Sequence, residues 1–157
     1  MDYSVEVRET PEQALLVAKG RAGVSELGDK IGALFAEVYE FIKRSEIEEC
    51  GQNVIVYHDE VGKALLLTRR GVPLEVGVQI DGPIDEGKRV IRSATPAGRV
   101  ASAVHTGPYQ NLSLAHGAIR EWCIANKHEI AGPNWEIYGD WTEDESALTT
   151  EVVYLLK

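Results

Sequence analysis

The carboxylate best placed to recognise a charged organic molecule lies near the end of the chain. Glu151 directly precedes an apolar run, and the other residues on its expected strand face, Val153 and Leu155, are apolar. A carboxylate in such surroundings must find a partner, shift its pKa upward, or wait for a cationic or hydrogen-bonding ligand. The alternative is a glutamate on an edge strand that reaches solvent. Glu151 is therefore the first candidate for a binding residue.

Four aromatic side chains are candidates to complete such a site: Tyr57, Tyr109, Tyr138 and Trp141. Strand alternation predicts that Tyr57 and Tyr138 lie on the same side as Glu75 and Glu151, at the junction of two similar halves of the chain. A buried carboxylate ringed by aromatic rings suits a flat, apolar, often cationic molecule. For the tyrosines, a place in the core is the alternative.

Other kinds of chemistry find little support in the residue pattern. The four histidines have no metal-ligand spacing, and Cys50 and Cys123 form no CxxC motif, so we expect no metal site. No nucleophile elbow or phosphate-binding glycine loop is present, so we expect no cofactor. The sequence favours binding over covalent catalysis.

The composition of the chain limits the kinds of partner and the cellular compartment that we expect. The 157 residues carry 16 Lys+Arg and 25 Asp+Glu, a formal net charge of -9, which speaks against nucleic acid as a partner. No apolar stretch is long enough to cross a membrane, and the acidic, alternating N-terminus is unlike a signal peptide, so we expect a cytoplasmic protein. The oligomeric state stays open.

The two halves of the chain resemble each other. Residues 51–59 match residues 132–140 at four of nine positions, and the matching segments follow the same order in both halves. We therefore expect one domain over residues 1–157, built from repeats at about 1–82 and 88–157.

Each half carries one helical pattern among segments that alternate with period two. Apolar residues at three- and four-residue steps predict helices over about 24–42 and 112–123. The alternation predicts strands in the segments 3–7, 15–17, 54–56, 65–67, 74–80, 100–105, 135–137 and 152–156. The pattern predicts an α+β fold with helices on one face of antiparallel sheet and a cleft between two joined units.

Several segments resemble the gyrase-inhibitor-like small-molecule-binding domain family, which occurs as the effector-binding part of multidrug-sensing transcription regulators and as free-standing proteins. The resemblance covers nearly the whole chain. It is carried by the segment Val104-His105-Thr106-Gly107-Pro108-Tyr109, by Gly132-Pro133 and Ile137-Tyr138, and by Leu148-Thr149-Thr150-Glu151-Val152.

The resemblance implies two βαββ modules of the SHS2 type, related by a pseudo-twofold axis, with a ligand cleft between them. It also implies that Glu151 lies at the base of an aromatic pocket, with Tyr109 and Tyr138 among its walls. The expected function is polyspecific binding of planar lipophilic, often cationic, small molecules. The regulators' DNA-binding extension has no counterpart in these 157 residues, so we do not expect transcriptional regulation by this chain itself.

Two alternatives belong to other classes of function. Some free-standing relatives open the cyclopropane ring of DNA-alkylating natural products, and in that case Glu151 is the expected catalytic residue, activating water. Other relatives interact with DNA gyrase, and an acidic surface could mimic nucleic acid. We favour binding without catalysis.

Overall fold

The computed structural model describes residues 2–59 and 67–157. Its helices are α1 (Leu27–Arg44) and α2 (Leu112–Ala125), with short 3-10 helices η2 (Tyr109–Asn111) and η3 (Glu145–Ala147). The described strands are β1 (Glu6–Thr10), β2 (Gln13–Ala22), β3 (Asn53–His58), β4 (Val72–Gln79), β5 (Val90–Thr95), β6 (Gly98–Thr106), β7 (Ile130–Tyr138) and β8 (Thr149–Leu156).

All eight strands belong to one antiparallel sheet, in the order β1-β6-β8-β7-β3-β4-β2-β5. This order has a twofold symmetry about the β3–β7 pair, because β1, β6, β8 and β7 correspond to β5, β2, β4 and β3. Each half also places its first strand beside the other half, since β1 pairs with β6 and β5 with β2. The α+β fold with two helices is confirmed.

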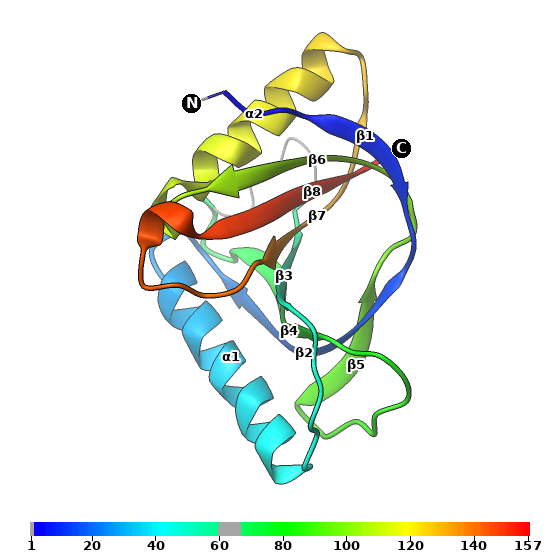
Figure 1. Ribbon diagram of the computed structural model, residues 1–157, viewed down its shortest axis with the longest axis vertical. Coiled ribbons are helices and arrows are strands. Elements are labelled where there is room, and N and C mark those ends of the chain that lie inside the picture. The colour runs from blue at the N-terminus through cyan, green and yellow to red at the C-terminus, as the bar shows by residue number, and fades with distance from the viewer. Residues whose placement is uncertain (1, 60–66) are drawn as a thin grey trace.

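The sheet is strongly curved. Strand β1 lies at one edge, yet only Pro11 and Glu12 separate it from β2, which lies near the opposite edge. Such a short connection requires the two edges to approach each other, and Figure 1 shows β1 arching over to β2 around the hollow side of the sheet. The sheet therefore has an inner, concave face and an outer face that carries both helices.

Side chains alternate between these two faces. On the outer face, α1 packs over Leu74, Val76 and Val78, as their period-two spacing predicted. Helix α2 packs over a second outer cluster that includes Ala101 and Val152. The concave face is filled by a third cluster of buried residues: Leu15, Val17, Val54, Val56, Val100, Trp135 and Val153.

Two strand predictions need comment. Strand β5 was missed, because it is short, lies at the sheet edge and carries the polar side chains Arg92 and Ser93 among its apolar ones. The strand expected at 65–67 falls largely on residues outside those described. Both helices lie within three residues of their predicted positions.

Gly77 is required where β2 and β4 pair. A Cβ atom on Gly77 would collide with the backbone carbonyl oxygen of Leu16, and backbone cannot move aside as a side chain can. We expect Gly77→Ala to lower the free energy of unfolding by about 2–4 kcal/mol. Urea denaturation followed by circular dichroism measures it.

The matched control is Gly117→Ala in α2, where a Cβ atom would meet nothing within 4 Å. Alanine favours a helix over glycine by up to about 1 kcal/mol, so this variant should be as stable as the parent or slightly more so. Equal destabilisation by the two substitutions would contradict the close approach at Gly77.

Candidate functional site

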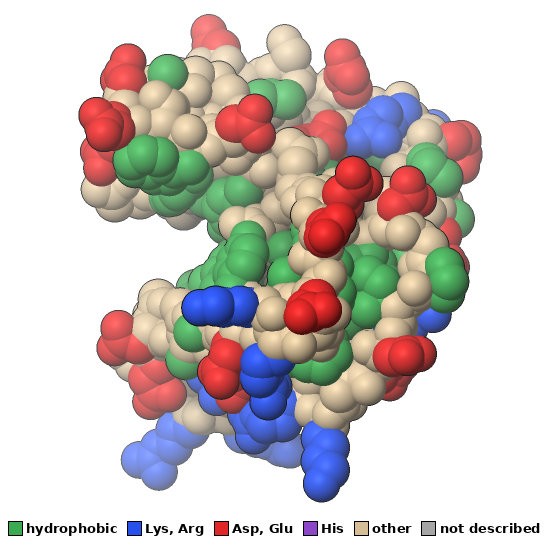
Figure 2. Space-filling model, turned by 60° about the horizontal axis from the view of Figure 1, so that its bottom comes forward, with side chains coloured by type: hydrophobic (Ala, Val, Ile, Leu, Met, Phe, Trp, Pro, Cys, Tyr) green, Lys and Arg blue, Asp and Glu red, His purple; other side chains and the backbone are tan. Residues whose placement is uncertain are grey.

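A cleft on the outer face lies where the two halves meet. Its cavity of about 510 Å³ is bounded by α1, β3, α2, β7 and β8, and so takes side chains from both halves. A neighbouring groove of about 850 Å³ shares Ile31, Tyr109 and Tyr138 with it. The space-filling view shows one hollowed face of the molecule, where apolar side chains surround a recess and charged ones lie at the rims (Figure 2). The cleft volume is that of an ordinary small-molecule site.

A buried carboxylate lies in this cleft. Glu136 on β7 is only 3% exposed, although it lines the cavity. Its Oε1 atom accepts hydrogen bonds from the hydroxyls of Tyr57, at 3.1 Å, and Tyr138, at 2.6 Å. His116 Nε2 lies 2.7 Å from the other oxygen, Oε2. Three partners from three elements thus compensate for the loss of water around this group.

A chain of hydrogen bonds continues from Glu136 through His116 to the rim of the cleft. His116 Nδ1 lies 2.7 Å from the Tyr154 hydroxyl, and Arg120 donates to that same hydroxyl at 2.9 Å. If Tyr154 donates to Nδ1, then Nε2 carries the proton and donates to the carboxylate, so a neutral ring satisfies both neighbours. The chain connects Glu136 to a guanidinium at the surface.

The tyrosines around Glu136 are held in their protonated form. Burial and the adjacent Glu136 carboxylate raise the pKa of Tyr57 and of Tyr138 well above the ordinary value. Burial also raises the pKa of Tyr154 to about 12, although Arg120 acts in the opposite direction. The phenols therefore remain hydrogen-bond donors at neutral pH.

Aromatic rings form the walls of the cleft. The ring of Tyr109 meets Tyr138 edge-on, with centroids 5.3 Å apart, and His116 packs edge-on against Tyr57 and Tyr154. Tyr109 is partly exposed at the mouth, whereas Glu136 is buried below it. A cavity of this kind offers ring faces to a flat apolar molecule and one negative charge to a cation.

The structure brings the three predicted tyrosines together but separates them from Glu151. Tyr57, Tyr109 and Tyr138 all line the cleft. Glu151 lies on the concave face, where Arg8 Nη2 donates to its Oε2 at 3.1 Å. The expectation that Glu151 shares a face with Tyr57 and Tyr138 is wrong. Whether Glu151 binds a ligand stays a prediction.

The strand register explains this difference. Residues directly opposite in an antiparallel pair point to the same face of the sheet. Ile137 is opposite Glu151, so Tyr138, the next residue, points away from Glu151. Val56 is opposite Glu75, so Tyr57 likewise points away from Glu75. The prediction of which residues within one strand share a face was right. The prediction of which residues of the neighbouring strand lie on that same face was wrong.

Glu75 and Trp141 also lie apart from Glu136. The carboxylate of Glu75 is hydrogen-bonded by His58 and Ser93 on the concave side. Burial alone would raise the pKa of Glu75, but these bonds and the charges of His58 and Lys19 lower it below the usual value. Trp141 is 72% exposed and lines the groove beside the cleft.

Sequence reasoning missed Glu136, His116 and Tyr154. The signal for Glu136 was present, because it lies two residues before Tyr138 on one strand and must share its face. His116 and Tyr154 reach the cleft from α2 and β8, which no sequence spacing relates to β7.

The described part of the chain contains neither a cluster suited to a metal ion nor a helix suited to a membrane. Within residues 2–59 and 67–157, no group of three or more His, Cys, Asp or Glu side chains could hold a metal ion. Among the helices of that same part, none is both long and apolar enough to span a membrane.

Comparison with known proteins identifies the family. The model of the GyrI-like small molecule binding domain matches residues 3–157, so the chain belongs to this family. No curated protein matches the sequence.

Solved structures show the same fold. The C-terminal domain of EcmrR has a TM-score of 0.75 and 17% identity, with 100% of this chain and 99% of that chain covered. SAV2435 bound to tetraphenylphosphonium has a TM-score of 0.69 and 12% identity, covering 100% and 94%. A hydrolase from Listeria innocua has a TM-score of 0.66 and 11% identity, covering 98% and 92%. Identities this low show similarity of fold alone.

The raised phenol pKa values predict a loss of stability at high pH. In the unfolded chain these tyrosines ionise near pH 10, whereas in the folded protein they resist ionisation. Their contribution is therefore complete below about pH 10 and is lost as the pH rises through the folded pKa, at about 12 for Tyr154. The free energy of unfolding should fall by up to about 1.4 kcal/mol per pH unit for each such phenol.

Urea titrations over this pH range test the effect. Tyr154→Phe should remove that phenol's contribution to the slope. Tyr39→Phe serves as the control, because Tyr39 on α1 is 46% exposed and makes its hydrogen bond to Asn53, outside the Glu136 contacts. Identical slopes for the parent and Tyr154→Phe would show that Tyr154 is not protected from ionisation.

Proposed function

We propose that the cleft binds planar or propeller-shaped lipophilic cations, with Glu136 as the counterion and the tyrosines as the apolar walls. The single observation that carries this proposal is the buried Glu136 carboxylate in an aromatic cavity large enough for a small molecule. Family membership supports small-molecule binding in general. The structural neighbour SAV2435 was solved with a lipophilic cation, tetraphenylphosphonium.

The hydrogen bonds to Glu136 suit this ligand class. The hydroxyls of Tyr57 and Tyr138 bring neutral donors, so they stabilise the carboxylate without cancelling its charge. A cation such as tetraphenylphosphonium has no N–H group and needs no vacant lone pair. It gains from its attraction to the Glu136 charge across a short distance of low-dielectric medium and from contact with the rings. The cleft therefore needs no rearrangement of the Glu136 contacts to attract such a cation.

We expect polyspecific binding because one charge and several ring faces provide the main attraction in the cleft. The attraction between a charge and a ring face depends little on the exact orientation of the ligand, in contrast to a fixed set of hydrogen bonds. The adjoining groove, which Tyr109 and Tyr138 share with the cavity, gives larger ligands room to extend toward Trp141. Ligands of different outline should therefore compete for one site.

Binding of tetraphenylphosphonium and rhodamine 6G to purified variants tests the proposal. Glu136→Gln keeps the side-chain shape and removes the charge, so we expect affinity for both cations to fall by at least about tenfold. Isothermal titration calorimetry measures the first ligand and fluorescence polarisation the second. A neutral dye of similar size should lose much less affinity than either cation.

Two matched variants show whether a loss of cation affinity is specific to Glu136. Glu129→Gln removes an exposed charge from the ion pair with Lys157. Glu129 lines neither the cleft nor the groove beside it, so this variant should leave cation affinity unchanged. Glu151→Gln tests the sequence-based expectation directly. If Glu151→Gln weakens cation binding and Glu136→Gln does not, then the cation site is on the concave face and the proposal for Glu136 is wrong.

A hydrolase is the second candidate, favoured by the hydrogen-bonded chain that reaches Glu136. In this case Glu136, held in place by His116, would act as the general base and accept a proton from a water that attacks a bound cyclopropanoid ligand. Ring opening by the parent protein, lost in Glu136→Gln while binding persists, would favour the hydrolase; binding of the cyclopropanoid without turnover would favour a receptor.

A further inference from the structure

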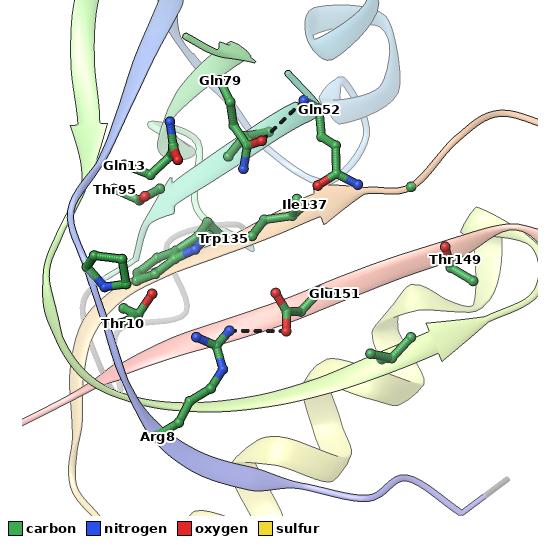
Figure 3. Close-up of a pocket in the computed structure, with 14 residues that line it drawn as sticks. Arg8, Thr10, Gln13, Gln52, Gln79, Thr95, Trp135, Ile137, Thr149 and Glu151 are labelled. Carbon is green, nitrogen blue, oxygen red and sulfur yellow. Dashed lines mark hydrogen bonds and ion pairs between the residues drawn. The ribbon is translucent and has the colours of Figure 1, made fainter. Parts of the chain in front are cut away.

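A second cavity, of about 400 Å³, lies on the concave face of the sheet, opposite the cleft. Figure 3 shows it bordered on one side by the segment that leads from β1 to β2. The buried cluster around Val17 and Val153 includes Val54 and Trp135, which also line this cavity. Its volume falls within the range of small-molecule sites.

Opposite charges lie side by side in this second cavity. Arg8 on β1 and Glu151 on β8 form an ion pair at 3.1 Å, and their side chains are 36% and 32% exposed. In the described part of the chain, this is the one side-chain hydrogen bond that either residue makes. Glu151 Oε1 and further N–H groups of Arg8 therefore remain able to accept and donate. The pair offers one position for a cation and one for an anion, a few ångströms apart.

Neutral amides line the other side of the second cavity. Gln13 Nε2 donates to the carbonyls of Ala14 and Ile80, which holds its amide in place. Gln79 Oε1 accepts from the backbone N–H of Gln52. This leaves the carbonyl oxygen of Gln13 and the amide nitrogen of Gln79 for other partners. Figure 3 shows both residues across the cavity from Arg8 and Glu151.

The floor between these two sides is apolar, and among the described residues no aromatic ring exposes its face there for stacking. Trp135 and Ile137 lie there, and Trp135 is only 2% exposed. Sugars and flat dyes rely on an exposed aromatic face, which this cavity does not provide. Its chemistry thus differs from that of the cleft.

We propose that this second cavity binds a free α-amino acid with an uncharged polar side chain. An α-amino acid carries its ammonium and carboxylate groups on one carbon atom, so the two charges are as close together as those of Arg8 and Glu151. Its carboxylate pairs with Arg8, its ammonium with Glu151, and the existing ion pair need not break. The side chain extends over Trp135 toward Gln13 and Gln79. This proposal is independent of the proposed cation site.

Calorimetric titration of the parent protein with L-glutamine is the first test. We expect saturable binding with a dissociation constant below about 1 mM. N-acetyl-L-glutamine lacks the ammonium and L-glutaminamide lacks the carboxylate, so each should bind at least about tenfold more weakly. Equal affinity for these derivatives would overturn the proposal, as would the absence of saturable binding of L-glutamine, L-asparagine, L-serine and L-threonine up to about 10 mM.

Two substitutions test the residues. Arg8→Gln and Glu151→Gln should each weaken L-glutamine binding by at least about tenfold, while Glu129→Gln, in a surface ion pair, should not change it. Unchanged affinity in both cavity variants would overturn the proposal. Tetraphenylphosphonium binding measured on the same samples reports on the cleft separately, so failure at one site is distinguishable from failure at the other.

Arg8 also ties β1 to β8 across the sheet, so a variant that fails to fold would not inform on binding. Nuclear magnetic resonance of the parent protein with added L-glutamine answers the question without substitution. Amide shifts confined to the residues around this cavity, in β1, β2, β4, β7 and β8, would support the proposal. Shifts confined to the cleft, around Tyr109 and His116, would overturn it.

Discussion

The pairing of β3 with β7 is the constraint on which the rest of the structure depends. It joins the two halves in the middle of one continuous sheet, with Ile55 opposite Glu136 and Val56 opposite Trp135. This register turns Glu136 to the outer face and brings it within reach of the Tyr57 hydroxyl from the other half. A slip of one residue would exchange the two faces of β7, placing the carboxylate among the apolar residues of the concave core. The register of the β3–β7 pair therefore determines which side chains form the site.

A carboxylate as buried as Glu136 is unfavourable unless its oxygens find partners. Here the partners come from β3, β7 and α2, so the carboxylate links the helix of the second half to strands of both halves. Burial keeps the phenols of Tyr57 and Tyr138 protonated, and so does Glu136, because a second negative charge beside the first would be repelled. A preformed group of this kind needs little reorganisation when a ligand arrives, which lowers the cost of binding.

The two faces of the sheet provide two different chemistries from neighbouring residues. Along β7, Trp135 and Ile137 belong to the concave side, whereas Glu136 and Tyr138 belong to the cleft. The cleft combines aromatic rings with a buried carboxylate, and the second cavity combines a balanced ion pair with neutral amides. Curvature of the sheet matters for both, since the helices lie outside the curve (Figure 1) and the second cavity lies inside it.

The sequence by itself determined the local features of this protein: two amphipathic helices, the alternation within each strand, and the likeness of the two halves. It also indicated that Tyr57 and Tyr138 belong together. Only the tertiary structure decided which carboxylate they meet. Alternation shows which residues of one strand share a face, but a neighbouring strand can align in either phase, and that phase depends on contacts between distant segments. The Ile137–Glu151 pair aligns β8 so that Glu151 lies on the opposite side from Tyr138, leaving Glu136 in the cleft.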